Sequence, residues 1–271
     1  MDIKEIDIYT MHGYWCHRKE CMIALITGAS SGIGRDMARV LANKNYDLIL
    51  VARDLKKLKE LKNELKTNVE IISLDLSDIE NCKKLYEQVK NKNIDILINN
   101  AGFGDIGLFS KTDIDKELNM IDLNIKAYHI LTKLFLKDFI KRDSGYILNV
   151  SSSASFQPGP LMATYYSTKA YVTNLTLAIY EELRRTKSNV KISCLCPGPV
   201  STNFNKVANC EFSLNSLSSK YVAEYAIDKM LKNKLLIIPG TTIKLLYLFG
   251  RFIPNKLMLR ITYNIQHRKT K

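Results

Sequence analysis

The sequence predicts an α/β protein, a single domain built on a doubly wound parallel sheet with helices on both faces. Short apolar runs alternate with helix-forming segments along most of the chain, as in repeated βα units. The first apolar run leads directly into a glycine-rich turn, where such sheets bind phosphates. The chain has 271 residues, 46% of them hydrophobic, which is enough to bury the core of one such domain.

The first strand is expected over Met22–Thr27, an apolar run suited to a buried parallel strand. A turn, Gly28-Ala29-Ser30-Ser31-Gly32-Ile33-Gly34, and a helix-forming segment, Arg35–Asn43, follow it. Glycines there let backbone amides approach a pyrophosphate, and the helix N-terminus favours its charge. The spacing differs from the Gly-x-Gly-x-x-Gly of most dinucleotide-binding folds. We expect a dinucleotide to contact Gly28, Ser30, Ser31, Gly32, Ile33 and Gly34.

Further strands and helices alternate after this turn. Strands are expected over Asp47–Ala52, Val69–Leu74, Ile94–Ile98, Tyr146–Val150 and Val190–Cys196, and helices over Leu55–Lys66, Ser77–Asn91, Asp113–Lys141 and Thr164–Lys187. Ser77 is expected to cap its helix, with Glu80 completing a capping box, and Asp54 to cap the preceding helix. Ligands of such sheets bind beyond the carboxyl ends of the strands. The residues expected at that edge include Gly28, Asn100, Ser152 and Pro197.

A tyrosine and a lysine one helical turn apart are a candidate acid–base pair, because a neighbouring ammonium lowers the pKa of a phenol. The pattern occurs three times, at Tyr86/Lys90, Tyr165/Lys169 and Tyr225/Lys229. Ser152 lies thirteen residues before Tyr165, and Ser73 stands at the same interval before Tyr86. Only Tyr165/Lys169 begins a helix just past the ligand end of a strand. We expect the other two pairs to be solvated helix faces.

The ordered set of motifs resembles the short-chain dehydrogenase/reductase family over roughly residues 22–238. The motifs are Thr27-Gly28-x-x-x-Gly32-x-Gly34, Asn99-Asn100-Ala101-Gly102, Ser152, Tyr165-x-x-x-Lys169 and Pro197-Gly198. The resemblance implies hydride transfer between a nicotinamide cofactor and a carbonyl or alcohol carbon. It also implies a homodimer or homotetramer packed through the long helices. A non-catalytic nucleotide-binding regulator or scaffold with the same fold is the alternative.

The resemblance assigns roles to individual residues. Tyr165 exchanges a proton with the substrate oxygen, and Lys169 lowers the pKa of Tyr165 and binds the nicotinamide ribose. Ser152 hydrogen-bonds the substrate oxygen, although Ser151 and Ser153 flank it and strand-end hydrogen bonding is their alternative role. Asn124 holds a water in a proton relay, or is only a local backbone partner. Further cofactor contacts are expected at Asn100, Ala101, Gly102, Pro197 and Gly198, at Asp75 and Leu76 beside the adenine, and at Val200 and Thr202 beside the carboxamide.

The end of the second expected strand indicates the cofactor. An acidic residue there accepts the adenosine ribose hydroxyls of NAD, whereas a basic residue binds the 2′-phosphate of NADP. The sequence is Val51-Ala52-Arg53, and an arginine can clamp a phosphate with two hydrogen bonds. Ser31 stands at the other position where the family often has a basic residue. NADP is therefore favoured over NAD.

Residues 1–21 precede the expected catalytic domain, residues 22–239. His12, Cys16, His17 and Cys21 could in principle bind zinc, but their spacing fits no familiar zinc finger. We expect a disordered extension or a start codon placed too far upstream, and no metal site. The six cysteines form no disulfide framework and no signal peptide is evident, so a reducing cytoplasm is expected.

Residues 240–271 form a basic, apolar segment, expected to be helical. The net charge is +13, and residues 229–271 hold ten Lys or Arg and no Asp or Glu. Pro254 interrupts the segment, and neither half reaches the length needed to span a bilayer. Two interpretations stay open: an interfacial helix pair on an anionic leaflet, or a cap over the substrate cleft. Nucleic-acid binding is not expected, because no recognition module accompanies the charge.

The same segment resembles the C-terminus of a bacterial subgroup of the family with broad substrates. Together with the apolar loop containing Phe204 and Phe212, it favours a lipophilic carbonyl or alcohol, such as a fatty-acyl or steroid-like compound. A phosphopantetheine-linked acyl group is another candidate, since basic residues attract an acidic carrier.

Overall fold

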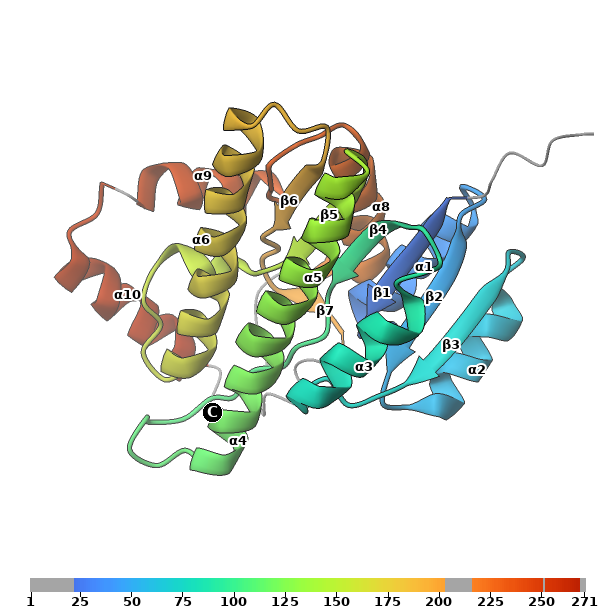
Figure 1. Ribbon diagram of the computed structural model, residues 1–271. Coiled ribbons are helices and arrows are strands. Elements are labelled where there is room, and N and C mark those ends of the chain that lie inside the picture. Colours follow the sequence, from blue (N-terminus) through green and yellow to red (C-terminus); the bar gives the residue numbers. More distant parts are fainter. Residues whose placement is uncertain (1–21, 203–215, 251, 269–271) are drawn as a thin grey trace, which may run out of the picture.

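The computed structural model describes residues 22–202, 216–250 and 252–268, and it confirms the predicted fold (Figure 1). Within these residues a seven-stranded parallel sheet has the order β3-β2-β1-β4-β5-β6-β9. The strand order reverses between β1 and β4, the switch point at which such sheets open a crevice. The strands are β1 (Ile23–Thr27), β2 (Asp47–Ala52), β3 (Val69–Ser73), β4 (Ile94–Asn99), β5 (Tyr146–Val150), β6 (Lys191–Leu195) and β9 (Leu236–Ile237).

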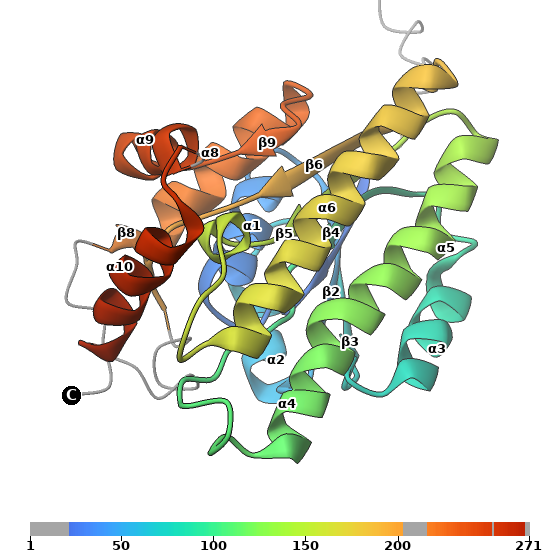
Figure 2. The ribbon, with the colours of Figure 1, turned by 90° about the vertical axis from the view of Figure 1, so that its left-hand side faces the viewer.

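Helices cover both faces of the sheet, because successive strand residues point to opposite sides and both sides are apolar. Ala24 and Ile26 of β1 belong to a core with α1 (Gly32–Ala42), α2 (Leu55–Glu64) and α8 (Ser219–Leu231). Leu25 belongs to a second core with α3 (Ile79–Val89), α5 (Tyr128–Lys141) and α6 (Ala163–Arg185). Figure 2 shows α5 and α6 running side by side.

The long helical region expected over residues 113–141 has three parts. Asp113 caps α4 (Ile114–Ile121), and a π-helical turn, Asp122–Ala127, joins α4 to α5. π-Helical turns inside α-helices are frequent at functional sites, since the extra residue re-aims the side chains around it. Asn124 lies within this turn and is buried.

Two local predictions were wrong. Ser77 does not cap α3: the side chain of Asp78 accepts the hydrogen bond from the Glu80 amide. The Ser77 hydroxyl instead donates to Asp75 Oδ1 at 2.8 Å, and this hydrogen bond takes the place of a bond to the helix end. Helix α1 begins at Gly32 and not at Arg35, so the last two glycines of the turn form its first turn. Asp54 caps α2 as predicted, accepting from the Lys57 amide.

The C-terminal part of the chain forms two further helices, α9 (Thr241–Gly250) and α10 (Asn255–His267), beyond the β9 end of the sheet (Figures 1 and 2). A small separate sheet pairs β7 (Val200–Ser201) with β8 (Leu217–Ser218). None of the helices in the described ranges combines the length and the apolar character that crossing a bilayer requires. The predictions for residues 1–21, including His12, Cys16, His17 and Cys21, and for Phe204 and Phe212, lie outside the described residues.

Candidate active site

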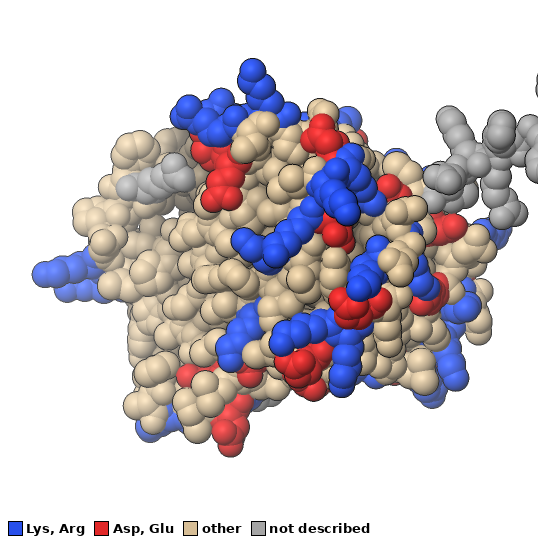
Figure 3. Space-filling model, viewed as in Figure 1, with Lys and Arg blue, Asp and Glu red and all other residues tan. Residues whose placement is uncertain are grey.

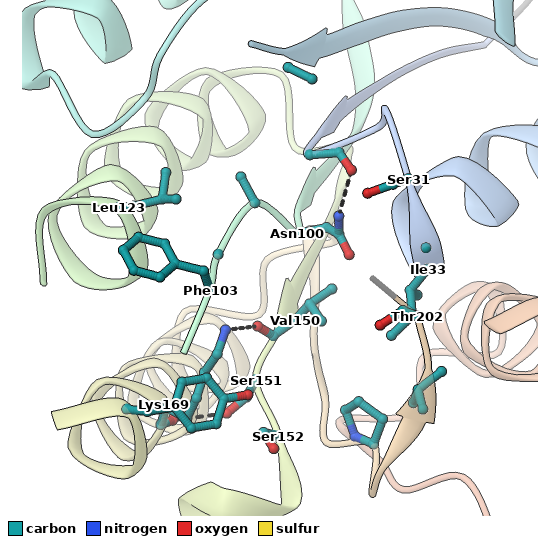
Figure 4. Close-up of a pocket in the computed structure, with 18 of the residues that line it drawn as sticks. Ser31, Ile33, Asn100, Phe103, Leu123, Val150, Ser151, Ser152, Lys169 and Thr202 are labelled. Carbon is teal, nitrogen blue, oxygen red and sulfur yellow. Dashed lines mark hydrogen bonds between the residues drawn. The ribbon is translucent and has the colours of Figure 1, made fainter. Parts of the chain in front are cut away.

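A cavity of about 490 Å³ opens at the carboxyl ends of the strands (Figure 4). It contains nearly all of the predicted site residues: Gly28, Ser30, Ser31, Gly32, Ile33, Arg53, Asp75, Leu76, Asn100, Ala101, Gly102, Ser152, Tyr165, Lys169, Pro197, Gly198, Val200 and Thr202. Gly34 and Asn124 do not line it. The strand ends therefore bring together residues that are up to 174 positions apart between Gly28 and Thr202.

The glycine turn is braced by the segment after β4. Gly28 has φ +66°, and a Cβ on it would lie 2.8 Å from Ala101 Cα. Asn100 Nδ2 donates to the carbonyl oxygens of Thr27 and Gly28, at 3.0 and 3.1 Å. A Cβ on Gly34 would overlap that same amide. Gly34 therefore leaves room for the Asn100 side chain, which holds the turn in shape. Its role is to make this contact possible, and Gly34 does not itself line the cavity.

Thr27, at the end of β1, joins this strand to the segment after β4. Its hydroxyl oxygen accepts hydrogen bonds from the Asn100 and Ala101 amides, at 2.9 and 3.1 Å, and its side chain is buried. The sequence placed Thr27 in a motif without assigning it this contact. Only the pairing of β1 with β4, strands separated by some seventy residues, makes the contact visible.

Lys169 is almost fully buried, and its ammonium donates to the Val150 carbonyl at 3.0 Å. Its Nζ lies 5.9 Å from the centre of the Tyr165 ring and 5.2 Å from that of Tyr128. Burial lowers the pKa of Lys169 to about 8, because the charged form loses its hydration. The Tyr128 hydroxyl also donates to Val150 O, at 3.1 Å. The lysine is thus held beside the tyrosine, and among the described residues no carboxylate forms an ion pair with it.

The three consecutive serines after β5 have different surroundings. The buried Ser151 hydroxyl donates to the Lys169 carbonyl at 2.8 Å and contacts Thr173 Oγ1. Ser152 Oγ accepts from the Ala154 amide at 3.1 Å, which leaves its own proton for another acceptor. Figure 4 shows Ser152 close to Lys169 at one end of the cavity, away from Ser31 and Ile33. Strand-end hydrogen bonding, the alternative role for the flanking serines, fits Ser151.

Asn124 lies behind the cavity wall. Its Nδ2 donates to Phe103 O at 2.9 Å and to Thr168 Oγ1 at 3.1 Å, and its Oδ1 accepts from the Phe103 amide. A Cβ on Gly102 would lie 2.8 Å from Asn124 Oδ1. Asn124 therefore ties the loop after β4 to α6. The proton-relay role suggested by the resemblance stays a prediction.

At the end of β2, Arg53 lines the cavity and is largely exposed, with its guanidinium 3.5 Å from Asp75 Oδ2. Lys57, which the sequence did not single out, also lines this part and pairs with Asp54 at 2.9 Å. Two cations therefore stand where the second strand ends.

Several lining residues were missed by the sequence reasoning. Phe103, Met162, Tyr166 and Gln266 line the cavity, and Gln266 comes from α10, one hundred residues after Tyr166. Gln266 Nε2 donates to the Tyr166 hydroxyl. No motif signals Gln266, because its place depends on how α10 folds back against the cavity. In the described part of the chain, His, Cys, Asp and Glu side chains form no group that could hold a metal ion.

The fold and the cavity define the class of an α/β dinucleotide-binding oxidoreductase, and comparison with known proteins agrees. A family model described as short chain dehydrogenase matches residues 22–211. An uncharacterized oxidoreductase of Staphylococcus epidermidis is 32% identical over 182 residues, covering 66% of this chain and 78% of that protein. The chain belongs to the short-chain dehydrogenase/reductase family.

Two further likenesses carry information on ligands. A short-chain dehydrogenase from Sphingobium yanoikuyae, solved in complex with NADPH, aligns with a TM-score of 0.77 and 28% identity, over 85% of this chain and 93% of that one. The very-long-chain 3-oxoacyl-CoA reductase of Mycosarcoma maydis is 29% identical over 218 residues, covering 74% of this chain and 62% of that protein.

Proposed function

We propose that this protein is an NADP(H)-dependent oxidoreductase that moves a hydride between nicotinamide and a carbonyl or secondary alcohol carbon of a lipophilic substrate. The observation that carries the proposal is the joint placement of Ser152, Tyr165 and Lys169 in the cavity that also contains the glycine turn. A serine, a tyrosine or a lysine alone would be weak evidence. Here the serine after β5, the two α6 residues and the glycine turn between β1 and α1 all line one cavity, which supports a single reaction site.

The residues fit a nicotinamide dinucleotide. The glycine turn opens α1 with no side-chain cap at Ser31, so the first amides of the helix are available to a pyrophosphate. The missing Cβ of Gly102 leaves room in front of Lys169 Nζ, which a Cβ would approach to 3.4 Å. When bound, the nicotinamide supplies the hydride in reduction and accepts it in oxidation.

The side chains handle the proton and the charge on the substrate oxygen. In reduction the Tyr165 hydroxyl donates a proton to the carbonyl oxygen, and the Lys169 ammonium stabilises the phenolate that remains. The Ser152 oxygen accepts from the Ala154 amide, so its O–H is available to donate a hydrogen bond to the same substrate oxygen as negative charge develops on it. Oxidation runs these proton movements in reverse.

NADP is the proposed cofactor because Arg53 and Lys57 both line the cavity at the end of β2, where a 2′-phosphate would lie. Arg53→Ala is expected to lower kcat/KM for NADPH by about 10-fold or more while leaving NADH nearly unchanged. The matched control is Lys62→Ala, a lysine on the exposed face of the same helix, α2. Steady-state rates with both cofactors give the ratio of kcat/KM for NADPH to kcat/KM for NADH in each variant. A wild-type enzyme that strongly prefers NADH would contradict the NADP assignment.

A lipophilic substrate is proposed because Ala154, Met162 and the aromatic rings of Tyr165 and Tyr166 form one buried cluster beside Ser152. The named substrate of the Mycosarcoma maydis relative is a very-long-chain acyl group. A panel of ketones and secondary alcohols of increasing chain length, scored by NADPH absorbance, tests this class. Turnover restricted to short, polar carbonyls would contradict it. The homodimer or homotetramer implied by the family resemblance stays a prediction that light scattering can test.

A further inference from the structure

The two C-terminal helices carry their apolar side chains on the outside. The buried residues of α10 are polar, Thr262 and Gln266, whereas its large apolar side chains are exposed: Leu257, Leu259, Ile261, Tyr263 and Ile265. A helix packed on a protein in water normally has the opposite distribution. In α9 no residue is buried, and Leu245, Leu246, Leu248 and Phe249 are all more than half exposed. Something apolar is therefore expected to cover this surface.

Phe252, in the turn between the two helices, is the extreme case at 83% exposed. We call α9, the turn at Phe252 and α10 together the C-terminal surface. In Figure 3 the part of the molecule over these helices, at the left, is largely tan. Its apolar residues are contiguous along the chain and are not scattered single side chains, which distinguishes them from ordinary surface residues.

The C-terminal surface has only one sign of charge. Lys244, Lys256, Arg260 and Arg268 lie among its apolar residues, and the chain has no Asp or Glu after Asp228. Apolar side chains interspersed with lysine and arginine are typical of helices that lie in the interface of an anionic bilayer. A symmetric contact between two copies would instead bring two positively charged patches together, since the same patch meets itself, and the like charges would repel.

The inner sides of these helices pack against the cavity, and α10 contributes one lining residue. Ile243 of α9 packs against Gly198, where a Cβ would lie 2.7 Å from Ile243 Cγ1. The Tyr247 ring lies 4.6 Å from that of Phe156, in the short helix that follows Ser152. From α10, Gln266 reaches the cavity and bonds Tyr166. Helix α10 thus lines the cavity through Gln266, α9 packs behind Gly198 and Phe156, and both helices present an apolar, basic outer face.

We propose that the C-terminal surface binds the surface of an anionic bilayer, and that a bilayer-dissolved substrate enters the cavity beside these helices. Phe249, Phe252 and the exposed leucines insert below the headgroups, while Lys256, Arg260 and Arg268 pair with anionic lipids. The Lys244 ammonium donates to the Tyr225 hydroxyl at 3.0 Å and adds positive charge nearby. The first half of the proposal is independent of the chemistry. The second half rests on the proposed oxidoreductase function.

Sedimentation with vesicles tests the docking. The full-length protein is expected to bind vesicles of phosphatidylcholine mixed with phosphatidylglycerol, to bind phosphatidylcholine alone more weakly, and to dissociate as salt rises. Phe252→Asp is expected to weaken partitioning by about 10-fold or more, since it replaces an aromatic ring that inserts into the bilayer with a charge. Phe109→Asp is the matched control: Phe109 is 69% exposed on the loop between β4 and α4, and the charge change is identical.

Three results would overturn the docking proposal. One is no binding to the anionic vesicles. Another is equal weakening by Phe252→Asp and Phe109→Asp, which would show that binding follows net charge and not the C-terminal surface. The third is a change of oligomeric state, and not of vesicle binding, in Phe252→Asp, which would make a second copy the occupant. Thermal unfolding of both variants verifies that they fold.

Turnover tests the route of the substrate. With NADPH, anionic vesicles are expected to raise the wild-type rate on a long-chain methyl ketone severalfold, but not on a short, water-soluble methyl ketone. Phe252→Asp should lose the vesicle effect and keep the rate on the soluble ketone. Vesicle binding without any such acceleration would overturn the substrate route alone. Binding by a protein that reduces neither ketone would leave docking intact and refute the proposed function instead.

Discussion

Helices α3 and α6 each offer a tyrosine followed four residues later by a lysine, with a serine thirteen residues before the tyrosine. At the end of α3, Lys90 pairs with Glu87 at 2.6 Å, and the Tyr86 hydroxyl donates to Asp138 at 2.7 Å. In α6, Lys169 is buried against a backbone carbonyl of β5. The same spacing in the sequence therefore leads to two different electrostatic environments.

The neighbours decide what each pair can do. Burial and the hydrogen bond to Asp138 raise the pKa of Tyr86 to about 12, which makes it a poor acid near neutral pH. Burial lowers the pKa of Lys169 to about 8, and its ammonium donates to a neutral carbonyl. Within the described ranges, carboxylates pair with both members of the first pair and none pairs with Lys169. The difference arises because Tyr165 and Lys169 lie near the start of α6, at the carboxyl ends of the strands, whereas Tyr86 and Lys90 lie at the end of α3.

The largest expected contrast is between Tyr165→Phe and Tyr86→Phe. Tyr165→Phe should lower kcat/KM by about 10³-fold, because it removes the proton donor, and should leave NADPH affinity nearly unchanged. Tyr86→Phe should leave kcat/KM within about twofold and lower the free energy of unfolding by about 1–3 kcal/mol, since Asp138 loses a hydrogen bond. Ketone reduction, NADPH titration and urea denaturation measure the three quantities. Equal losses of kcat/KM in both variants would contradict the assignment of Tyr165, and not Tyr86, as the proton donor.

The second largest contrast is expected between the serines thirteen residues before each tyrosine, Ser152 and Ser73, in their effect on kcat. Ser152→Ala is expected to lower kcat by about 10²-fold, because a hydrogen-bond donor to the developing oxyanion is lost. Ser73 donates instead to the Arg53 carbonyl at 3.0 Å, so Ser73→Ala should change kcat by no more than about twofold. Single-turnover reduction of one ketone by both variants provides the comparison. A Ser152→Ala enzyme with wild-type kcat would mean that this hydroxyl does not act on the substrate.

The parts of the molecule that could be predicted are those determined by local sequence. The apolar runs are buried on both sides of the sheet, so they could be recognised as strands and ordered with the glycine turn. The cap of α3 was mistaken because Ser77 and Asp78 are both suitable caps, and Asp75 takes the Ser77 hydroxyl. The π-helical turn at Asn124 has no distinct periodicity by which a sequence could reveal it.

The parts of the site that could not be predicted depend on contacts between distant elements. The carbonyl that holds Lys169 and the Tyr128 hydroxyl that shares it come from β5 and α5. Gln266 enters the cavity only because α10 folds back to the sheet edge. The sequence left open whether residues 240–271 cap the cleft or contact a membrane, and the two roles are compatible in this structure. Gln266 of α10 lines the cavity, whereas the outer faces of α9 and α10 are apolar.

The two pairs should also differ in the pH dependence that the lysine sets. Its pKa of about 8 in the folded protein lies below the ordinary 10.5. Below pH 8 both the folded and the unfolded chain carry this proton, and the penalty for burying the charge is fully present. Between pH 8 and 10.5 the unfolded chain binds more protons than the folded one, so the contribution of this lysine to the free energy of unfolding rises with pH. The rise should total about 3 kcal/mol.

Activity should change in the opposite direction, because the phenolate needs the ammonium beside it. kcat/KM is expected to fall about tenfold per unit above pH 8. Lys169→Met should abolish the rise in stability and be more stable than the wild type at pH 7, since Val150 O still accepts from Tyr128. Lys90→Met, at the exposed lysine of the α3 pair, is the matched control. It should keep the wild-type pH dependence of both stability and kcat/KM. Denaturation and initial rates across pH 6–10 measure them together. An activity profile that stays flat above pH 8 would show that the buried lysine does not need its proton for the reaction.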